Sequence, residues 1–395
     1  MPAPATTTAR VAVALATVAL LATACGGSTL PAPAASADAS PSGPAASQES
    51  AAPTELIDDA LAPLVKAAEQ EGSLNVIGLP HDWCNYGEAL TTFTSRYAIS
   101  LNELNPDAAF ADEITAIQAN RDSKGPAAPD VIDVGLSFAA QAKAAKLLAP
   151  YKVATWATIP AAAKDPAGAW YGDYYGVLAF ETNTSSGAIP PTDWADLLTP
   201  GRTPLLALAG DPRVSGQAIE TVYAAALANG GSLNNAQPGL DFFAKLKKAG
   251  RLATTIAQPE TIDSGGTPLT IRWTYNALAH RDRTAGAPAI DVTVPAKGRL
   301  GGFYAQAISA FAPHPNAARL WMEFLYSDDG QGIWLKGNCH PIRFDDLATR
   351  DVIPADILAN LPDTSGTVFP TLDQLTKASD LITNQWNAVV GVDIR

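Results

Sequence analysis

The residues best placed to do chemistry belong to the loop 211–216, which precedes a predicted helix over 217–228. The first N–H groups of a helix lack intrahelical partners and favour an anion, so Ser215 and Gly216 would bind a negatively charged group. Arg213 would add a charge-assisted contact. In the alternative interpretation, Asp211 or Ser215 only caps the helix and Arg213 faces water. The sequence leaves both interpretations open.

Patterns for catalysis and metal binding are missing. The stretch Gly135-Leu136-Ser137-Phe138-Ala139 lacks the second glycine of a nucleophile elbow, and neither His-Glu-x-x-His nor a phosphate-binding Walker loop occurs. The 4 histidines are scattered and suggest no triad or metal cluster. We therefore expect a protein that is not an enzyme, with no catalytic residues, no metal and no cofactor.

Composition narrows the class of partner. The chain has 395 residues, 47% of them hydrophobic and 16% charged, and a formal net charge of −13. This acidic balance argues against a nucleic-acid partner, because phosphates require basic surface. The residues after 54 are numerous enough for two domains.

The first 54 residues predict export and anchoring. Residues 1–24 have the parts of a signal peptide, with Arg10 before a short apolar run. The run ends at Leu21-Ala22-Thr23-Ala24-Cys25, followed by Gly26-Gly27-Ser28, which resembles a bacterial lipobox with Cys25 as the lipidated residue. An ordinary cleaved signal or a short membrane anchor is the alternative. Residues 25–54 are rich in Ala, Pro, Ser and Gly and are expected to be a disordered tether.

Two cysteines remain once Cys25 is assigned to the lipid. Cys84 and Cys339 would lie in an oxidising compartment, so we predict a disulfide between them. Two buried free thiols are the alternative. No Cys-x-x-Cys pair suggests a metal site instead.

The elements that must position these residues follow from hydrophobic periodicity. Strands alternate with amphipathic helices, which predicts an α/β fold with parallel sheets covered by helices on both faces. Strands are expected over 74–79, 99–104, 131–134, 205–208, 268–273, 290–294 and 302–308, and helices over 86–97, 112–121, 138–148, 217–228, 240–248, 275–280, 316–326, 329–336, 354–360 and 372–389.

The order of these elements predicts an inserted second unit. We expect residues 55–180 and 303–395 to form lobe 1 and residues 181–302 to form lobe 2. The chain would cross between the lobes near 178–182 and 290–304, and these crossings would act as a hinge. A ligand would bind in the cleft, where helix N-termini and strand ends converge.

Several segments resemble the solute-binding proteins of ABC importers. They are Asp130-Val131-Ile132-Asp133-Val134, Trp170-Tyr171-Gly172-Asp173-Tyr174-Tyr175-Gly176, residues 210–216, Ile271-Arg272-Trp273-Thr274-Tyr275-Asn276-Ala277-Leu278 and Ala312-Pro313-His314-Pro315-Asn316-Ala317-Ala318. The similarity is to the branch that includes ferric-iron, polyamine, thiamine and 2-aminoethylphosphonate binders. It implies a type II periplasmic-binding-protein-like fold with two Rossmann-like lobes. It also implies a small-molecule solute and an ABC permease as partners, and with the lipobox we expect a monomer at the outer face of the membrane. A lipoprotein that presents its ligand to a membrane sensor is the alternative.

The resemblance also frames the choice of ligand. Ferric-iron binders of this branch use two adjacent tyrosines where this chain has Trp273-Thr274, although the pair Tyr174-Tyr175 keeps iron open. Polyamine binders place a clamping aspartate where this chain has Gln306, which lacks the charge to offset ammonium desolvation. The leading expectation is therefore a phosphonate-like or other anionic or zwitterionic solute. The expected ligand-binding residues are Trp83, Asn85, Ser137, Tyr175, Arg213, Ser215, Gly216, Trp273, Tyr275, Tyr304 and Gln306.

Overall fold

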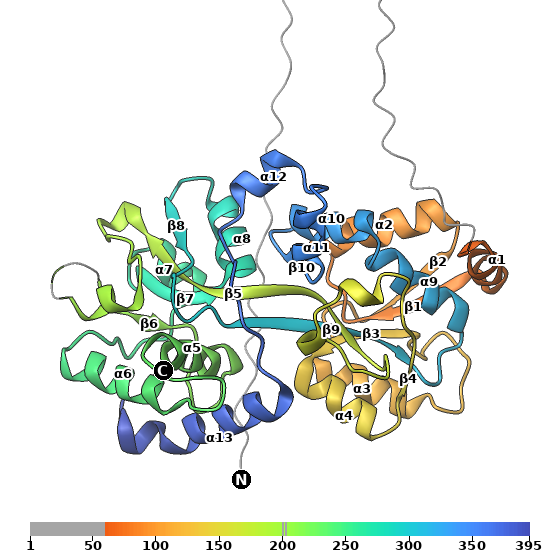
Figure 1. Cartoon of the computed structure of the whole chain (residues 1–395). Coiled ribbons are helices and arrows are strands. Elements are labelled where there is room, and N and C mark those ends of the chain that lie inside the picture. The colour runs from red at the N-terminus through yellow and green to blue at the C-terminus, as the bar shows by residue number, and fades with distance from the viewer. Residues whose placement is uncertain (1–59, 200, 202–203) are drawn as a thin grey trace, which may run out of the picture. The chain divides into compact units, whose positions relative to one another are not determined.

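The computed structural model describes residues 60–199, 201 and 204–395 (Figure 1). The expected signal peptide 1–24, the expected lipidation site Cys25 and the expected tether 25–54 lie outside the described residues. Within the described part of the chain, no helix is both long and apolar enough to cross a membrane.

Eight strands of the described chain form one mixed sheet, in the order β3-β9-β5-β7-β6, with β10 and β8 paired to β5 and β4 paired to β9. These strands are β3 (Val131–Gly135), β4 (Leu148–Ala149), β5 (Tyr171–Asn183), β6 (Ala207–Leu208), β7 (Leu269–Trp273), β8 (Ile290–Thr293), β9 (Gly301–Ser309) and β10 (His340–Pro341). A separate parallel pair consists of β1 (Ser73–Ile77) and β2 (Ser100–Leu104). The Asp130 N–H donates to the Asn75 carbonyl at 2.9 Å, which places β1 beside the start of β3.

The expectation of parallel sheets is wrong for most strand pairs. Among the strands of the described residues, only β1–β2 and β6–β7 are parallel, whereas β5 pairs antiparallel with β7, β8, β9 and β10. The reason is the length of β5, which is buried along all 13 of its residues. Its first half pairs with β9 and its second half with β7 and β8, so one strand belongs to both ends of the molecule (Figure 1). The sequence pattern showed only its second half as a crossing segment.

Helices cover both faces of the strands (Figure 1). They are α1 (Ala62–Glu71), α2 (Tyr86–Tyr97), α3 (Phe110–Ala119), α4 (Leu136–Ala144), α5 (Gly216–Ala228), α6 (Gln237–Lys248), α7 (Pro259–Asp263), α8 (Thr274–Thr284), α9 (Pro315–Leu325), α10 (Asp328–Lys336), α11 (Phe344–Thr349), α12 (Ala355–Asn360) and α13 (Leu372–Val389). Helix α2 shows why periodicity located most of them: Tyr86, Leu90, Phe93 and Tyr97 recur at helical spacing and are all buried. Helices α1, α7 and α11 were not expected.

The C-terminal helix α13 packs differently from the expected division. It lies against α5 and α6, which the sequence assigned to lobe 2, while residues 303–395 were assigned to lobe 1. Trp386 on α13 is fully buried, with its ring centre 5.7 Å from that of Phe243 on α6. The Arg395 N–H donates to the Thr254 carbonyl at 2.8 Å. We call α1–α4, β1–β4 and α9–α11 the first half, and α5–α8, β6–β8 and α13 the second half.

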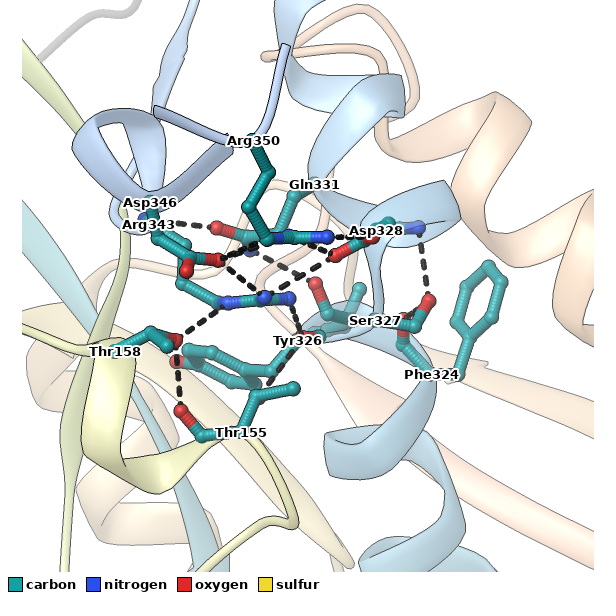
Figure 2. A network of polar contacts seen from close by, with 12 residues as sticks. Thr155, Thr158, Phe324, Tyr326, Ser327, Asp328, Gln331, Arg343, Asp346 and Arg350 are labelled. Atoms are coloured by element: carbon teal, nitrogen blue, oxygen red, sulfur yellow. Dashed lines mark hydrogen bonds and ion pairs between the residues drawn. The ribbon is translucent and has the colours of Figure 1, made fainter. Parts of the chain in front are cut away.

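A disulfide and a network of ion pairs hold the C-terminal part of the first half in place. The disulfide Cys84–Cys339 forms as predicted, with the two Cα atoms 5.6 Å apart. Nearby, Arg343 is only 3% exposed, and its guanidinium donates to the Tyr326 carbonyl at 2.6 Å and to Asp346 Oδ2 at 2.7 Å (Figure 2). A buried cation is tolerated only when its donors are paired, so this network fixes α11 against α10.

Candidate functional site

A cavity of about 640 Å³ is lined by elements of both halves. The second half contributes the N-terminal turns of α5, the junction between β7 and α8, and one face of α13. The first half contributes the junction between β3 and α4, and β9 contributes its first residues. Its lining residues are Phe110, Gly135, Leu136, Ser137, Ala209, Ser215, Gly216, Gln217, Ile219, Glu220, Trp273, Tyr275, Asn276, Gly301, Gly302, Phe303, Tyr304, Pro370, Leu372, Leu375, Thr376, Ser379 and Asp380. The volume suits a small molecule.

The N-terminus of α5 reaches the cavity as the sequence predicted. Ser215 caps the helix, with its Oγ accepting from the Ala218 N–H at 3.4 Å. Gly210 precedes it at φ 143°, and an added Cβ there would lie 2.3 Å from Ser215 Oγ, so this tight turn requires glycine. Both Ser215 and Gly216 line the cavity.

Arg213 does not join them. Its guanidinium pairs with Asp211 and with Asp393 at 2.7 Å, and it is absent from the cavity lining. Carboxylates in the same loop and near the C-terminus of the chain therefore satisfy this cation. Contact between Arg213 and an anionic ligand stays a prediction, and the pairing with Asp393 was not visible in the sequence.

Three aromatic side chains form a wall of the cavity, namely Trp273, Tyr275 and Tyr304. The rings of Trp273 and Tyr275 are stacked at 20°, with centres 6.4 Å apart. Glycines make room for them: an added Cβ at Gly302 would lie 2.7 Å from Trp273, and one at Gly176 would lie 2.5 Å from Tyr275. The wall thus packs directly on the backbone of β9 and β5.

Trp83 supports this wall from outside the cavity lining. Its ring meets Tyr275 edge-on at 5.3 Å and Tyr304 at 5.9 Å, and its Nε1–H donates to the Tyr174 hydroxyl at 2.6 Å. The adjacent disulfide at Cys84 holds the loop that carries it. The sequence predicted Trp83 as a ligand contact, whereas the structure places it behind the residues that line the cavity.

Glu220 is one of the cavity residues that sequence reasoning missed, and it is the one with a strongly shifted pKa. It lies on α5, four positions after Gly216 and hence on the same face of the helix. Its carboxylate has no hydrogen-bond or ion-pair partner among the described residues, and burial raises its pKa to about 7. The i, i+4 spacing from Gly216 in the expected helix was the signal that could have found it.

The charge of the cavity lining is negative. Glu220 and Asp380 are its acidic residues, and the described lining contains no Lys, Arg or His. Asp380 lies on α13 and is exposed to solvent, so Glu220 is the more desolvated of the two. An anionic ligand would meet these carboxylates without a cationic side chain to offset them.

A buried polar cluster lies among β3, β5, β9 and α2, outside the cavity lining. Tyr86 is its hub: its hydroxyl donates to Asp133 Oδ2 at 2.7 Å, accepts from Gln306 Nε2 at 2.7 Å and lies 3.1 Å from Asp173 Oδ2. Burial raises the pKa of Asp133 to about 7, and burial together with the charge of Asp133 raises the pKa of Asp173 well above its ordinary value. Gln306 is fully buried here and outside the cavity lining, and its contact with a ligand stays a prediction.

Two other expected residues also face away from the cavity. The Asn85 amide donates to Glu88 Oε2 at 2.7 Å at the start of α2. The Tyr175 hydroxyl bonds the Thr364 hydroxyl at 3.2 Å, while the neighbouring Tyr174 hydroxyl lies near Asp133 at 3.3 Å. Successive residues of a strand point to opposite faces, so Tyr174 and Tyr175 do not form a shared metal site. The described residues also hold no group of three or more His, Cys, Asp or Glu placed for a metal ion.

Of the expected ligand-binding residues, the cavity lining includes Ser137, Ser215, Gly216, Trp273, Tyr275 and Tyr304. It leaves out Trp83, Asn85, Tyr175, Arg213 and Gln306. The residues found are those beside glycines or at element junctions. The five expected residues outside the lining form hydrogen bonds or ion pairs with other residues of the protein. The sequence alone could not show these contacts.

Residues 127–364 match the family of the bacterial extracellular solute-binding protein. The chain belongs to this family. No curated protein matches it. Because the family is one of binding proteins, the match agrees with the expectation that the chain is not an enzyme. An extracellular or periplasmic location is likewise that of the family.

Solved structures share the fold of this solute-binding protein. The ferric iron-binding protein A of Mannheimia haemolytica, in an open conformation, is 18% identical, with a TM-score of 0.62 over 82% of this chain and 99% of that one. An ABC transporter protein of Clostridium perfringens is 16% identical, with a TM-score of 0.59 over 80% and 99%. The periplasmic binding protein AfuA of Actinobacillus pleuropneumoniae, with fructose-6-phosphate bound, is 20% identical, with a TM-score of 0.55 over 80% and 98%. These similarities establish the predicted α/β periplasmic-binding-protein fold.

Proposed function

We propose that this protein is the extracellular solute-binding component of an ABC importer, which captures a small polar solute and delivers it to a membrane permease. The observation that carries the proposal is the cavity of about 640 Å³ whose walls come from both halves of the molecule. Family membership and a similar structure from an ABC transporter support it. A solute that contacts both walls would stabilise the form in which they approach each other.

The mechanism that fits this arrangement is hinge closure. Glu220 and Trp273 reach the cavity from the second half, and Ser137 reaches it from the first half. β5 spans both ends of the sheet and is one connection about which the halves would rotate. Hinges absorb their motion in a few residues at element ends, so the rest of each half would move as a rigid body. The closed form would then dock on the permease.

Small-angle X-ray scattering of the exported protein tests hinge closure. Candidate solutes are first ranked by thermal shift, with 2-aminoethylphosphonate, phosphate, putrescine, spermidine, thiamine and ferric citrate as the panel. A solute at about 100 times its dissociation constant adds about 2.7 kcal/mol of stability. We expect the solute that raises the melting temperature also to lower the radius of gyration. A protein concentration series controls for association and tests the expected monomer. Stabilisation without compaction would contradict closure.

We further propose that Cys25 carries the lipid and anchors the protein to the outer face of the cell membrane. The lipobox-like sequence before Cys25 and the Ala-, Pro- and Ser-rich stretch after it support this proposal. Stable anchoring takes two lipid signals, because a single acyl chain binds a membrane only marginally. The mass of the mature N-terminal peptide tests it: an unmodified peptide, or one that does not begin at Cys25, would rule the anchor out.

A further inference from the structure

We propose that the solute is an organic ammonium ion whose charged nitrogen is bound by the Glu220 carboxylate and whose carbon skeleton packs on Trp273, Tyr275 and Tyr304. This inference rests on the proposed function and names the solute class of the same cavity. It replaces the phosphonate-like anion as the leading candidate, since a zwitterion fits only through its ammonium group.

The first argument is the unpaired charge of Glu220. Its side chain lines the cavity and has no hydrogen-bond or ion-pair partner among the described residues. Taking a carboxylate out of water without a partner costs free energy, and an opposite charge within contact distance offsets that cost. The raised pKa, about 7, has burial as its cause, and no neighbouring cation counters it. An ammonium group of the solute would supply the missing charge.

The second argument is the sign of the charge around Glu220. The described lining adds Asp380 and no basic side chain, and Arg213 is already paired with Asp211 and Asp393. A solute with a net negative charge would therefore meet carboxylates on both α5 and α13. Repulsion by these carboxylates opposes the attraction that the N-terminus of α5 exerts on an anion.

The third argument is the aromatic wall. Aromatic faces attract cations, and this attraction grows when the cation is desolvated. Trp273 and Tyr275 are 8% and 5% exposed, so each presents only a small part of its ring to the cavity. Gly302 and Gly176 leave no room for either ring to retreat. The wall is thus rigid, and a rigid aromatic surface beside a carboxylate favours alkylammonium compounds over inorganic cations.

The sequence argument against a cation does not apply to this cavity. It assumed that Gln306 occupies the place of a clamping carboxylate, but the Gln306 amide is fully buried and donates to Tyr86. The more desolvated carboxylate of the cavity lining, Glu220, comes from α5 instead. It lies on a helix of the second half and not on β9.

The experiment compares ammonium compounds with neutral or anionic analogues on the exported protein at pH 8, by isothermal titration calorimetry. The pairs are putrescine with 1,4-butanediol, choline with 3,3-dimethylbutanol, and 2-aminoethylphosphonate with ethylphosphonate. Spermidine and phosphate complete the set. We expect at least one ammonium compound to bind and its analogue to bind at least about tenfold more weakly.

Glu220→Gln is the decisive variant, because glutamine keeps the shape and a hydrogen-bond acceptor but loses the charge. Its affinity for the ammonium compound should fall about ten- to a hundredfold, as expected for a lost charged contact. Glu260→Gln is the matched control, since Glu260 is an exposed glutamate of α7 outside the cavity lining, and it should bind normally. Unfolding curves of both variants check that each is folded.

Three outcomes would overturn the proposal: equal binding by Glu220→Gln, binding of ethylphosphonate or phosphate as tightly as any ammonium compound, or no binding of any ammonium compound. Scattering on the same samples separates this inference from the proposed function. Compaction by a solute without an ammonium group would refute the solute class and leave hinge closure standing. Ammonium binding that depends on Glu220 but causes no compaction would support the solute class and refute hinge closure.

Discussion

Tyr86→Phe should be among the most destabilising single-atom changes in this protein. Tyr86 is fully buried, and its hydroxyl bonds both Asp133 and Gln306 at 2.7 Å. Phenylalanine keeps the ring and its edge contact with Trp334, whose ring centre is 4.8 Å away, so no large cavity forms. The effect therefore measures the loss of the hydroxyl from a buried polar cluster.

The magnitude follows from the groups left behind. Without that hydroxyl, Gln306 Nε2 has no acceptor, whereas Asp133 Oδ2 keeps the longer bond from the Tyr174 hydroxyl at 3.3 Å. A buried polar group left without its hydrogen bond costs about 1–3 kcal/mol, and more when it is charged. One such group at about 2 kcal/mol and a weakened contact of Asp133 at about 1 kcal/mol predict a loss of about 3 kcal/mol in the free energy of unfolding.

Urea unfolding of the exported protein, followed by tryptophan fluorescence, measures this loss. Tyr223→Phe is the control, because Tyr223 is also fully buried but its hydroxyl makes a single bond, to the Leu233 carbonyl at 2.6 Å. The control should lose about 1 kcal/mol. Both variants should keep the slope m of the wild type, which shows that the same surface unfolds. If Tyr86→Phe lowered the free energy of unfolding no more than Tyr223→Phe, the central role of Tyr86 in this hydrogen-bond cluster would be refuted.

Two further predictions concern pH and the disulfide. The folded protein raises the pKa of Asp133 from 3.8 to about 7, so the folded state holds this proton more tightly than the unfolded state. The stability that protonated Asp133 adds is fully present below about pH 4 and is lost as the pH rises to about 7. The free energy of unfolding falls there by at most about 1.4 kcal/mol per pH unit. Asp133→Asn should flatten that part of the curve, and an unchanged slope in urea unfolding at pH 5, 6 and 7 would contradict the assignment. The disulfide Cys84–Cys339 joins residues 255 positions apart, and its reduction should lower the free energy of unfolding by up to about 5 kcal/mol. Equal urea-unfolding midpoints with and without reductant would contradict this prediction.

The helices show how far the sequence could predict the fold. The expected ranges 86–97, 217–228 and 372–389 lie within a residue of α2, α5 and α13, because apolar residues recur at 3.6-residue spacing. The short α7 and α11 carry too few turns for such a pattern. Strand direction was not predictable either, since the periodicity of a strand is the same in parallel and antiparallel sheets.

The residues of the candidate site also divide into those set by local geometry and those set by contacts between distant parts of the chain. The turn before α5 was visible in the sequence, because Gly210 and the capping Ser215 serve local geometry. The ion pair of Arg213 was not visible in the sequence, because its partner Asp393 is 180 residues away in the chain. Glu220 carried no local signal beyond its spacing, and its significance comes from the lack of a partner in the folded molecule.

The sequence by itself determined the pairing of Cys84 with Cys339 and most helical segments, and the resemblance of several short segments indicated the family. The pairing follows from counting the cysteines, and the helices follow from periodicity within a few turns of chain. Only the tertiary structure decided that β5 joins both halves, that α13 packs on α5 and α6, and that Glu220 rather than Gln306 faces the cavity. These depend on which side chains meet across long separations, where burial and pairing of charge outweigh local preference.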